Sequence, residues 1–98
     1  MKDMSNAILG RAWIGIEDHG CLTCVLQLNG DGSTQGFGGR RLDGSGDNYA
    51  GPKIRALLDA LEVDSWDRVK GQAVRVRRDA GGMITAIGHI VKDRWFSW

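Results

Sequence analysis

The sequence predicts a mostly β protein with one helix (α+β), built as a five-stranded, OB-like β-barrel with the element order β-β-β-α-β-β. Five segments carry the two-residue alternation of apolar side chains that is typical of strands, and one amphipathic segment lies between the third and the fourth. The chain has 15 glycines, and seven of them fall between residues 30 and 47, which suits the strongly coiled sheet of a small barrel. A two-layer α/β sandwich of the same elements is the alternative. The length of 98 residues fits a single domain, residues 1–98.

The first two predicted strands form an antiparallel hairpin. Residues 7–17 make the first strand, and its core-facing positions are Ile8, Ala12, Ile14 and Ile16. Residues 18–20 have the composition of a turn, because Asp and Gly both favour such positions. Residues 21–29 make the second strand, and its core-facing positions are Leu22, Cys24, Leu26 and Leu28.

A glycine-rich third strand leads through a loop into the helix. Residues 35–42 predict a strand whose glycines mark a bulge or a barrel corner, and residues 43–47 predict a loop. The helix is expected over residues 52–63, with Gly51 as its cap and Pro52 at its first position. Its apolar stripe consists of Ile54, Leu57, Leu58 and Leu61, and Arg55 and Asp59 can pair on the opposite side.

The remaining segments return to strand periodicity. Residues 64–69 form a short connector that packs Trp66 and Val69 inward. A fourth strand alternates valine and arginine at residues 74–77, and after a glycine-containing turn residues 83–91 form the fifth. The segment that follows is unusually rich in aromatic residues.

Composition excludes several functional classes. The net charge is +1, with 13 Lys and Arg against 12 Asp and Glu, so the chain lacks the basic excess needed for strong non-specific binding to nucleic acid or anionic membranes. No apolar run approaches the ~18 residues of a membrane span. The first residues lack the features of a secretory signal, and two cysteines without such a signal predict a reducing compartment. We therefore expect a cytoplasmic protein without membrane contact.

No constellation of catalytic or metal-binding residues is recognisable, so we expect no enzymatic activity, metal or cofactor. Cys21 and Cys24 have CxxC spacing, but residues three apart on a strand point to opposite faces, which favours a structural role. His19 is expected as an exposed turn residue and His89 as a locally hydrogen-bonded strand residue. The glycines between residues 30 and 39 lack the strand-turn-helix setting of a dinucleotide site.

The chain resembles a family of small phage and prophage proteins. The resemblance is carried by WIGIEDHGCLT, QGFGGRRLDG, IRALLDALEVDSW, KGQAVRVRRD and AIGHIVKDRWF, of which the closing GHIVKDRWF is the most specific. It implies a phage accessory protein in the host bacterial cytoplasm, outside the virion and the replication machinery. Such accessory proteins often antagonise host defence.

The main candidate site is an anion-binding segment on the third strand. Glycines allow backbone N–H groups to approach an anion, and neighbouring arginines supply charge beside an aromatic ring. The expected ligand-binding residues are Gln35, Gly36, Phe37, Gly38, Gly39, Arg40, Arg41, Arg75 and Arg77.

These features predict a non-enzymatic binding protein, an antagonist of host defence that blocks a host protein or sequesters a small phosphate-bearing, nucleotide-like ligand. The alternative is an OB-like module for single-stranded nucleic acid, in which Phe37, Tyr49 or Trp95 would stack on bases. The aromatic residues Trp95, Phe96 and Trp98 predict a partner interface if they are exposed, and a tail folded onto the core if they are buried. An exposed tail would also suit a homodimer.

Overall fold

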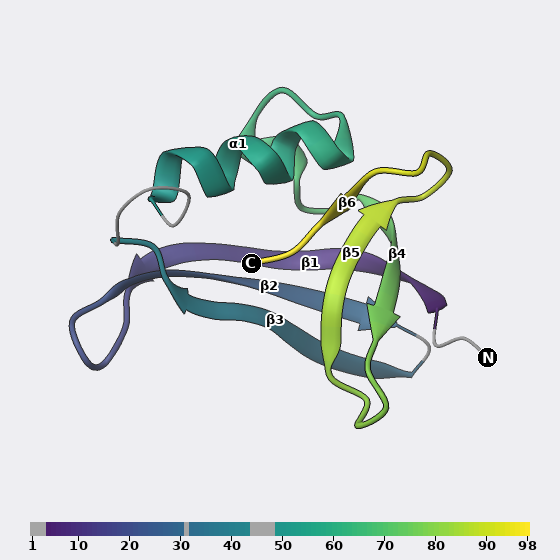
Figure 1. The fold of residues 1–98 in the computed structure, drawn as a ribbon, viewed down its shortest axis with the longest axis horizontal. Helices are drawn as coiled ribbons and strands as arrows, with labels where there is room; N and C mark the ends of the chain where they lie inside the picture. The colour runs from purple at the N-terminus through teal and green to yellow at the C-terminus, as the bar shows by residue number, and fades with distance from the viewer. Residues whose placement is uncertain (1–3, 31, 44–48) are drawn as a thin grey trace.

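The computed structural model describes residues 4–30, 32–43 and 49–98, which form one antiparallel sheet and one α-helix (Figure 1). In chain order the elements are β1 (Met4–Ile16), β2 (Leu22–Gly30), β3 (Ser33–Arg41), α1 (Ala50–Leu61), the 3-10 helix η2 (Trp66–Arg68), β4 (Ala73–Arg78), β5 (Ile84–His89) and β6 (Trp95–Phe96). The sheet has the strand order β3-β2-β1-β4-β5-β6. The prediction of a mostly β chain with one helix is confirmed.

The closed, five-stranded barrel is corrected to an open sheet of six strands. The sixth strand arises because Trp95 and Phe96 pair with Gly88 and Ile87 of β5. In the part of the chain that the structure describes, no strand pairing joins β3 to β5 or β6. Beyond Asp43, which bridges Tyr49, the predicted loop at residues 43–47 lies outside the described residues.

The long strand β1 gives the sheet its curvature because it serves two partners in succession. Its first half pairs with β4 and its second half with β2 (Figure 1). The register with β2 shifts between Leu9 and Ala12, and such a bulge increases the local twist. The bulge also reverses the parity of the strand, so Leu9 is buried whereas Ile8 is 47% exposed. The prediction that Ile8 faces the core was therefore wrong. Ile14 and Ile16, which were also predicted to face the core, are 39% and 64% exposed, so the end of β1 extends beyond the core.

Helix α1 packs its predicted apolar stripe toward β5 and β6. Leu57 and Leu61 are buried together with Ala60, while Ile54 and Leu58 are half-buried. The helix begins at Ala50 rather than at Pro52, and Tyr49 takes the N-cap position. It ends at Glu62, whose left-handed backbone (φ 58°) turns the chain away. Among the described residues, no helix is both long and apolar enough to cross a membrane.

The aromatic tail folds onto the sheet and completes the core. Phe96 is buried and makes edge-to-face contacts with Phe37 and Trp98, with ring centroids 6.4 and 4.8 Å apart. Phe96 therefore cannot belong to an exposed partner interface. Trp98 is half-buried, and the next section places it at the wall of a cavity.

Candidate functional site

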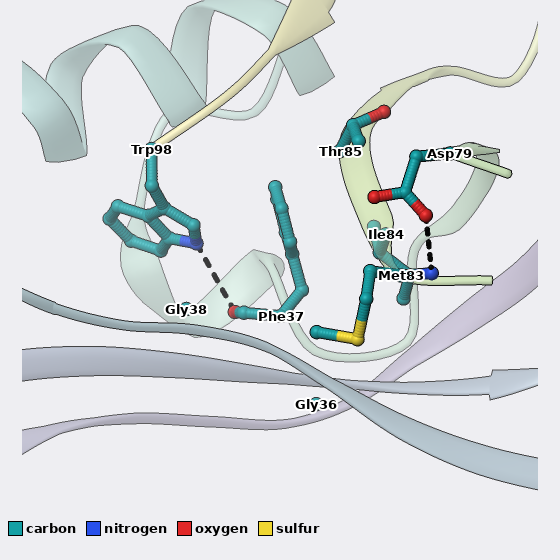
Figure 2. A pocket seen from close by; sticks show the side chains of 8 residues that line it. All are labelled: Gly36, Phe37, Gly38, Asp79, Met83, Ile84, Thr85 and Trp98. Carbon is teal, nitrogen blue, oxygen red and sulfur yellow. Dashed lines mark hydrogen bonds between the residues drawn. The ribbon is translucent and has the colours of Figure 1, made fainter. Parts of the chain in front are cut away.

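A concave feature of the described residues lies between two strand edges of the open sheet. A cavity of about 490 Å³ separates the outer edge of β3 from the start of β5 (Figure 2). It is lined by Gly36, Phe37, Gly38, Asp79, Met83, Ile84, Thr85 and Trp98. We call this cavity the edge groove. Sequence reasoning identified its β3 wall and Trp98, and missed the wall formed by the β4–β5 turn.

On the β3 side, backbone groups point into open space. The carbonyl of Phe37 accepts a hydrogen bond from Trp98 Nε1 at 3.2 Å. The N–H and C=O groups of one strand residue point to the same side, and this side alternates along the strand. The Leu42 N–H donates to the Leu22 carbonyl, so Leu22, Leu26 and Leu28 face β3, and Leu26 and Leu28 pair with Phe37 and Gln35. The backbone groups of Gly36 therefore face the free edge of β3.

On the β5 side, the partner strand is too short to cover the edge. β6 pairs only with Ile87 and Gly88. The carbonyl of Thr85 accepts a hydrogen bond from Ser97 Oγ at 2.8 Å. Thr85 is the extra residue of a bulge in the β4–β5 pairing, and its hydroxyl donates to the Arg77 carbonyl of β4 at 3.1 Å. Among the described residues, no strand covers the start of β5 on the side away from β4.

Side chains connect the two edges in place of a backbone ladder. Gln35 Nε2 donates to the Gly82 carbonyl at 3.2 Å, and Arg78 Nε donates to Gln35 Oε1 at 3.3 Å. Trp98 spans the other side through its bond to Phe37. The groove is therefore a braced opening between two strand edges.

Among the described residues that line the groove, the one charged group is a carboxylate. Asp79 Oδ1 accepts hydrogen bonds from the backbone N–H groups of Gly81 and Met83, at 2.9 and 3.0 Å, which fixes the β4–β5 turn. None of these described lining residues is a lysine or an arginine. The groove therefore favours a neutral or cationic occupant over an anion.

The arginines of the predicted anion site lie apart and have other partners. β3 and β4 are separated by two strands. Arg41 is ion-paired with Asp43, and its hydrogen bond lowers the pKa of that carboxyl. Arg75 donates to the carbonyls of His89 and Lys92 at 2.9 and 2.7 Å. Arg77 stacks on Trp95, 4.0 Å from the ring centroid.

Of the remaining predicted ligand residues, some line the edge groove and others form the bulge of β3. Gly36 and Gly38 line the groove, whereas the Phe37 ring points into the core and is only 7% exposed. The register of β2 and β3 shifts next to Gly38 and Gly39, which confirms the predicted glycine bulge. The Arg40 side chain lies outside the described part of the structure.

Both histidines have the local roles that the sequence predicts. His19 is exposed and bonds Glu17 at 3.0 Å within the same turn. The Nδ1 atom of His89 accepts the backbone N–H groups of Val91 and Lys92, at 3.1 and 3.0 Å. Cys24 is fully buried, and burial raises the pKa of its thiol to about 12. These groups therefore act structurally in the fold.

Sequence reasoning missed Asp79, Met83 and Thr85. Their placement depends on the approach of the β4–β5 turn to β3, which are more than forty residues apart in the chain. Compared with known proteins, the chain matches no family model, no curated protein and no solved structure. The functional argument therefore rests on the geometry of the edge groove.

Proposed function

We propose that this is a non-enzymatic binding protein that acts by occupancy and takes an extended segment of a partner protein into the edge groove. The single observation that supports this most is that free strand edges line both sides of one cavity. An extended segment that adds to a strand edge gains main-chain hydrogen bonds, and it needs no catalytic group from its receptor. Binding would block the partner by covering that segment.

Access to the edge supports the proposal. Gly36 and Gly38 contribute no side chains to the β3 wall, so a second backbone can approach closely. The backbone groups of Gly36 at the free edge of β3 supply a donor and an acceptor for such a backbone. Exposed edges of this kind are usually covered or protected in proteins that do not use them.

Of the two modes of action that the sequence suggests, the groove supports blocking a protein over sequestering a phosphate. Its lining holds a carboxylate and no cation, and Arg41, Arg75 and Arg77 are engaged elsewhere. With the resemblance to phage accessory proteins, the blocked partner would be a host protein, and the action would be antagonism of host defence in the host cytoplasm.

Binding of single-stranded nucleic acid is a second candidate, supported by Trp13. Trp13 is half-buried and borders a cavity of about 310 Å³ on the opposite side of β3, together with Arg11, Val25, Gln27, Thr34 and Gly36. An indole beside an arginine suits stacking on a base. Of the stacking residues that the sequence suggested, Phe37 is buried and Trp95 is covered by arginine. Tyr49 is 52% exposed at the N-cap of α1 and is not among the described residues that line this cavity. This function predicts that oligothymidine binds in a salt-dependent way and that Trp13→Ala abolishes the binding.

A peptide selection tests strand capture. Immobilised protein is panned with displayed random twelve-residue peptides, and enriched peptides are measured against two variants. Gly36→Pro removes an N–H at the free edge of β3, whereas Gly36→Ala retains it and serves as the matched control, because a Cβ at Gly36 meets only Val25 Cγ1 at 3.7 Å. We expect Gly36→Ala to bind normally and Gly36→Pro to bind about ten-fold or more weakly.

A second measurement does not depend on the fold of a variant. Enriched peptides are resynthesised with one N-methyl group at each position in turn, which removes one backbone donor at a time. Strand capture predicts that binding is lost at alternate positions. No enrichment over blank support, or equal tolerance of N-methylation at every position, would overturn the proposal.

A further inference from the structure

We infer that the edge groove selects extended segments carrying a lysine or arginine whose cationic head reaches the carboxylate of Asp79. The inference rests on the proposed strand capture and specifies the chemistry of the captured segment. It concerns one subsite, formed by the β4–β5 turn at the wall of the groove (Figure 2).

Asp79 is held in place with acceptor capacity to spare. Both of its backbone hydrogen bonds, from Gly81 and Met83, end on Oδ1. Its side chain borders the groove in Figure 2, opposite Phe37 and Trp98. A carboxylate has about four lone-pair sites, so Oδ2 can accept a further charged donor without breaking the turn.

No cation of the described residues compensates this carboxylate. Asp79 makes no ion pair in the part of the chain that the structure describes. The neighbouring Arg78 donates instead to Gln35 and to Ser5 Oγ, at 3.3 and 2.7 Å. Arg77 lies over Trp95. Among the described lining residues, the charge at the groove wall is therefore that of Asp79, which attracts a cationic side chain and disfavours an acidic one.

The surroundings of Asp79 also suit the stem of a long basic side chain. Met83 is 64% exposed and, with Ile84, forms an apolar wall of the groove near Asp79 (Figure 2). Lysine and arginine bury their methylene stems along such apolar surface while the charged head stays at a polar group. A small cation without a methylene stem would leave this apolar wall uncovered. The carboxylate and the apolar wall together therefore favour a peptide side chain over a small amine.

The test removes the charge and retains the turn. In Asp79→Asn the side-chain oxygen can still accept the N–H groups of Gly81 and Met83, while the negative charge is lost. Asp67→Asn is the matched control, because Asp67 is an exposed carboxylate on η2 and its substitution changes the net charge equally. Each enriched peptide is prepared with its basic residue and with norleucine in its place.

We expect enriched peptides to contain lysine or arginine at one recurring position. Asp79→Asn should weaken binding of the basic peptide by about ten-fold and leave binding of the norleucine peptide unchanged, as expected for a charge-assisted hydrogen bond. Asp67→Asn should change the binding of neither peptide. A small-amine probe, N-acetyl-lysine methylamide, should bind at least about a hundred-fold more weakly than the peptide, because it lacks the strand contacts.

Three results would overturn the inference. These are enriched peptides without a recurring basic residue, equal weakening of both peptides by Asp79→Asn, and binding of the small amine as tight as that of the peptide. If Gly36→Pro abolishes peptide binding while Asp79→Asn does not change it, the charge selectivity fails and strand capture stands. If neither substitution changes the binding, strand capture fails as well.

Discussion

Gly36 and Gly38 lie two residues apart on β3, yet only Gly38 excludes a side chain. Gly38 has φ 139°, and a Cβ there would overlap the Cys24 carbonyl oxygen, whereas a Cβ at Gly36 would meet only Val25 Cγ1 at 3.7 Å. We predict that Gly38→Ala lowers the free energy of unfolding by about 2 kcal/mol or more, and that Gly36→Ala changes it by less than about 1 kcal/mol. Urea unfolding followed by circular dichroism measures both, and equal losses would contradict this account of the bulge.

The Cys24 thiol illustrates how burial controls reactivity at a single residue. Its pKa is raised from 9.0 to about 12 by desolvation, which lowers the thiolate fraction near neutral pH by about a thousand-fold. In the variant Cys21→Ser, where Cys24 is the remaining cysteine, we predict that iodoacetamide leaves the native protein unmodified and alkylates it in urea. Mass spectrometry over a time course gives the rates. Comparable rates in the two conditions would show that Cys24 is accessible in the folded state.

At the scale of elements, Glu62 ties the end of α1 to the turn between β5 and β6. Its carboxylate accepts Lys92 Nζ at 2.9 Å and lies 3.3 Å from Arg94 Nη1 and 3.6 Å from His89 Nε2. The hydrogen bond from Lys92 is the main reason that the pKa of Glu62 is lowered below its usual 4.5. The folded state therefore holds this proton more weakly than the unfolded chain does.

The sign of this shift gives a pH prediction. A carboxyl with a lowered folded-state pKa stabilises the protein above its unfolded pKa, and the stabilisation is lost as pH falls through the folded value. Glu62→Gln should therefore be less stable than the wild type at neutral pH, and the difference should shrink below about pH 4.5. Urea unfolding across this pH range tests it, with Asp67→Asn as a control without the network. A difference that stays constant with pH would contradict the assignment.

The elements themselves were largely predictable, and their exceptions have local causes. Alternation and the apolar stripe located the helix and five of the six strands. Ile8 was placed on the wrong face because a bulge leaves Leu9 and Ala12 both inward. Gly10 lies in this bulge, and glycine within a strand is a bulge signal that the period-two interpretation did not use. The short strand β6 was missed because two paired residues are too few to show a period.

At the scale of the whole molecule, the open edge was beyond prediction because it depends on contacts between distant segments. The strand count and the glycine content fitted a closed barrel equally well. Whether β3 meets β5 is decided by Gln35, Arg78 and Trp98, which brace the gap from three separate parts of the chain. For the same reason, only one wall of the candidate site was predicted. Its glycines indicate the β3 wall in the sequence, whereas nothing in the sequence indicates that the β4–β5 turn forms the opposite wall.

The brace formed by Trp98 gives a prediction about the whole sheet. Trp98→Phe keeps an aromatic ring beside Phe37 and Phe96 but loses the N–H that bonds the Phe37 carbonyl across the gap. We expect a loss of about 1 kcal/mol, and faster amide hydrogen exchange along the free edge of β3. Trp95→Phe is the matched control, because its indole N–H bonds Asp93 two residues away and spans no gap.

The exchange pattern separates a brace from a simple loss of packing. If Trp98 holds the two edges together, its substitution acts on β3, which lies at the opposite end of the strand order from β6. Loss of packing in the tail would instead raise exchange in β5 and β6 first, where the tail itself is paired. Equal protection of β3 in Trp98→Phe and Trp95→Phe would show that the bond to Phe37 contributes nothing to the approach of the edges. Faster exchange confined to the β3 edge in Trp98→Phe would show that the same residue that lines the groove also sets its width.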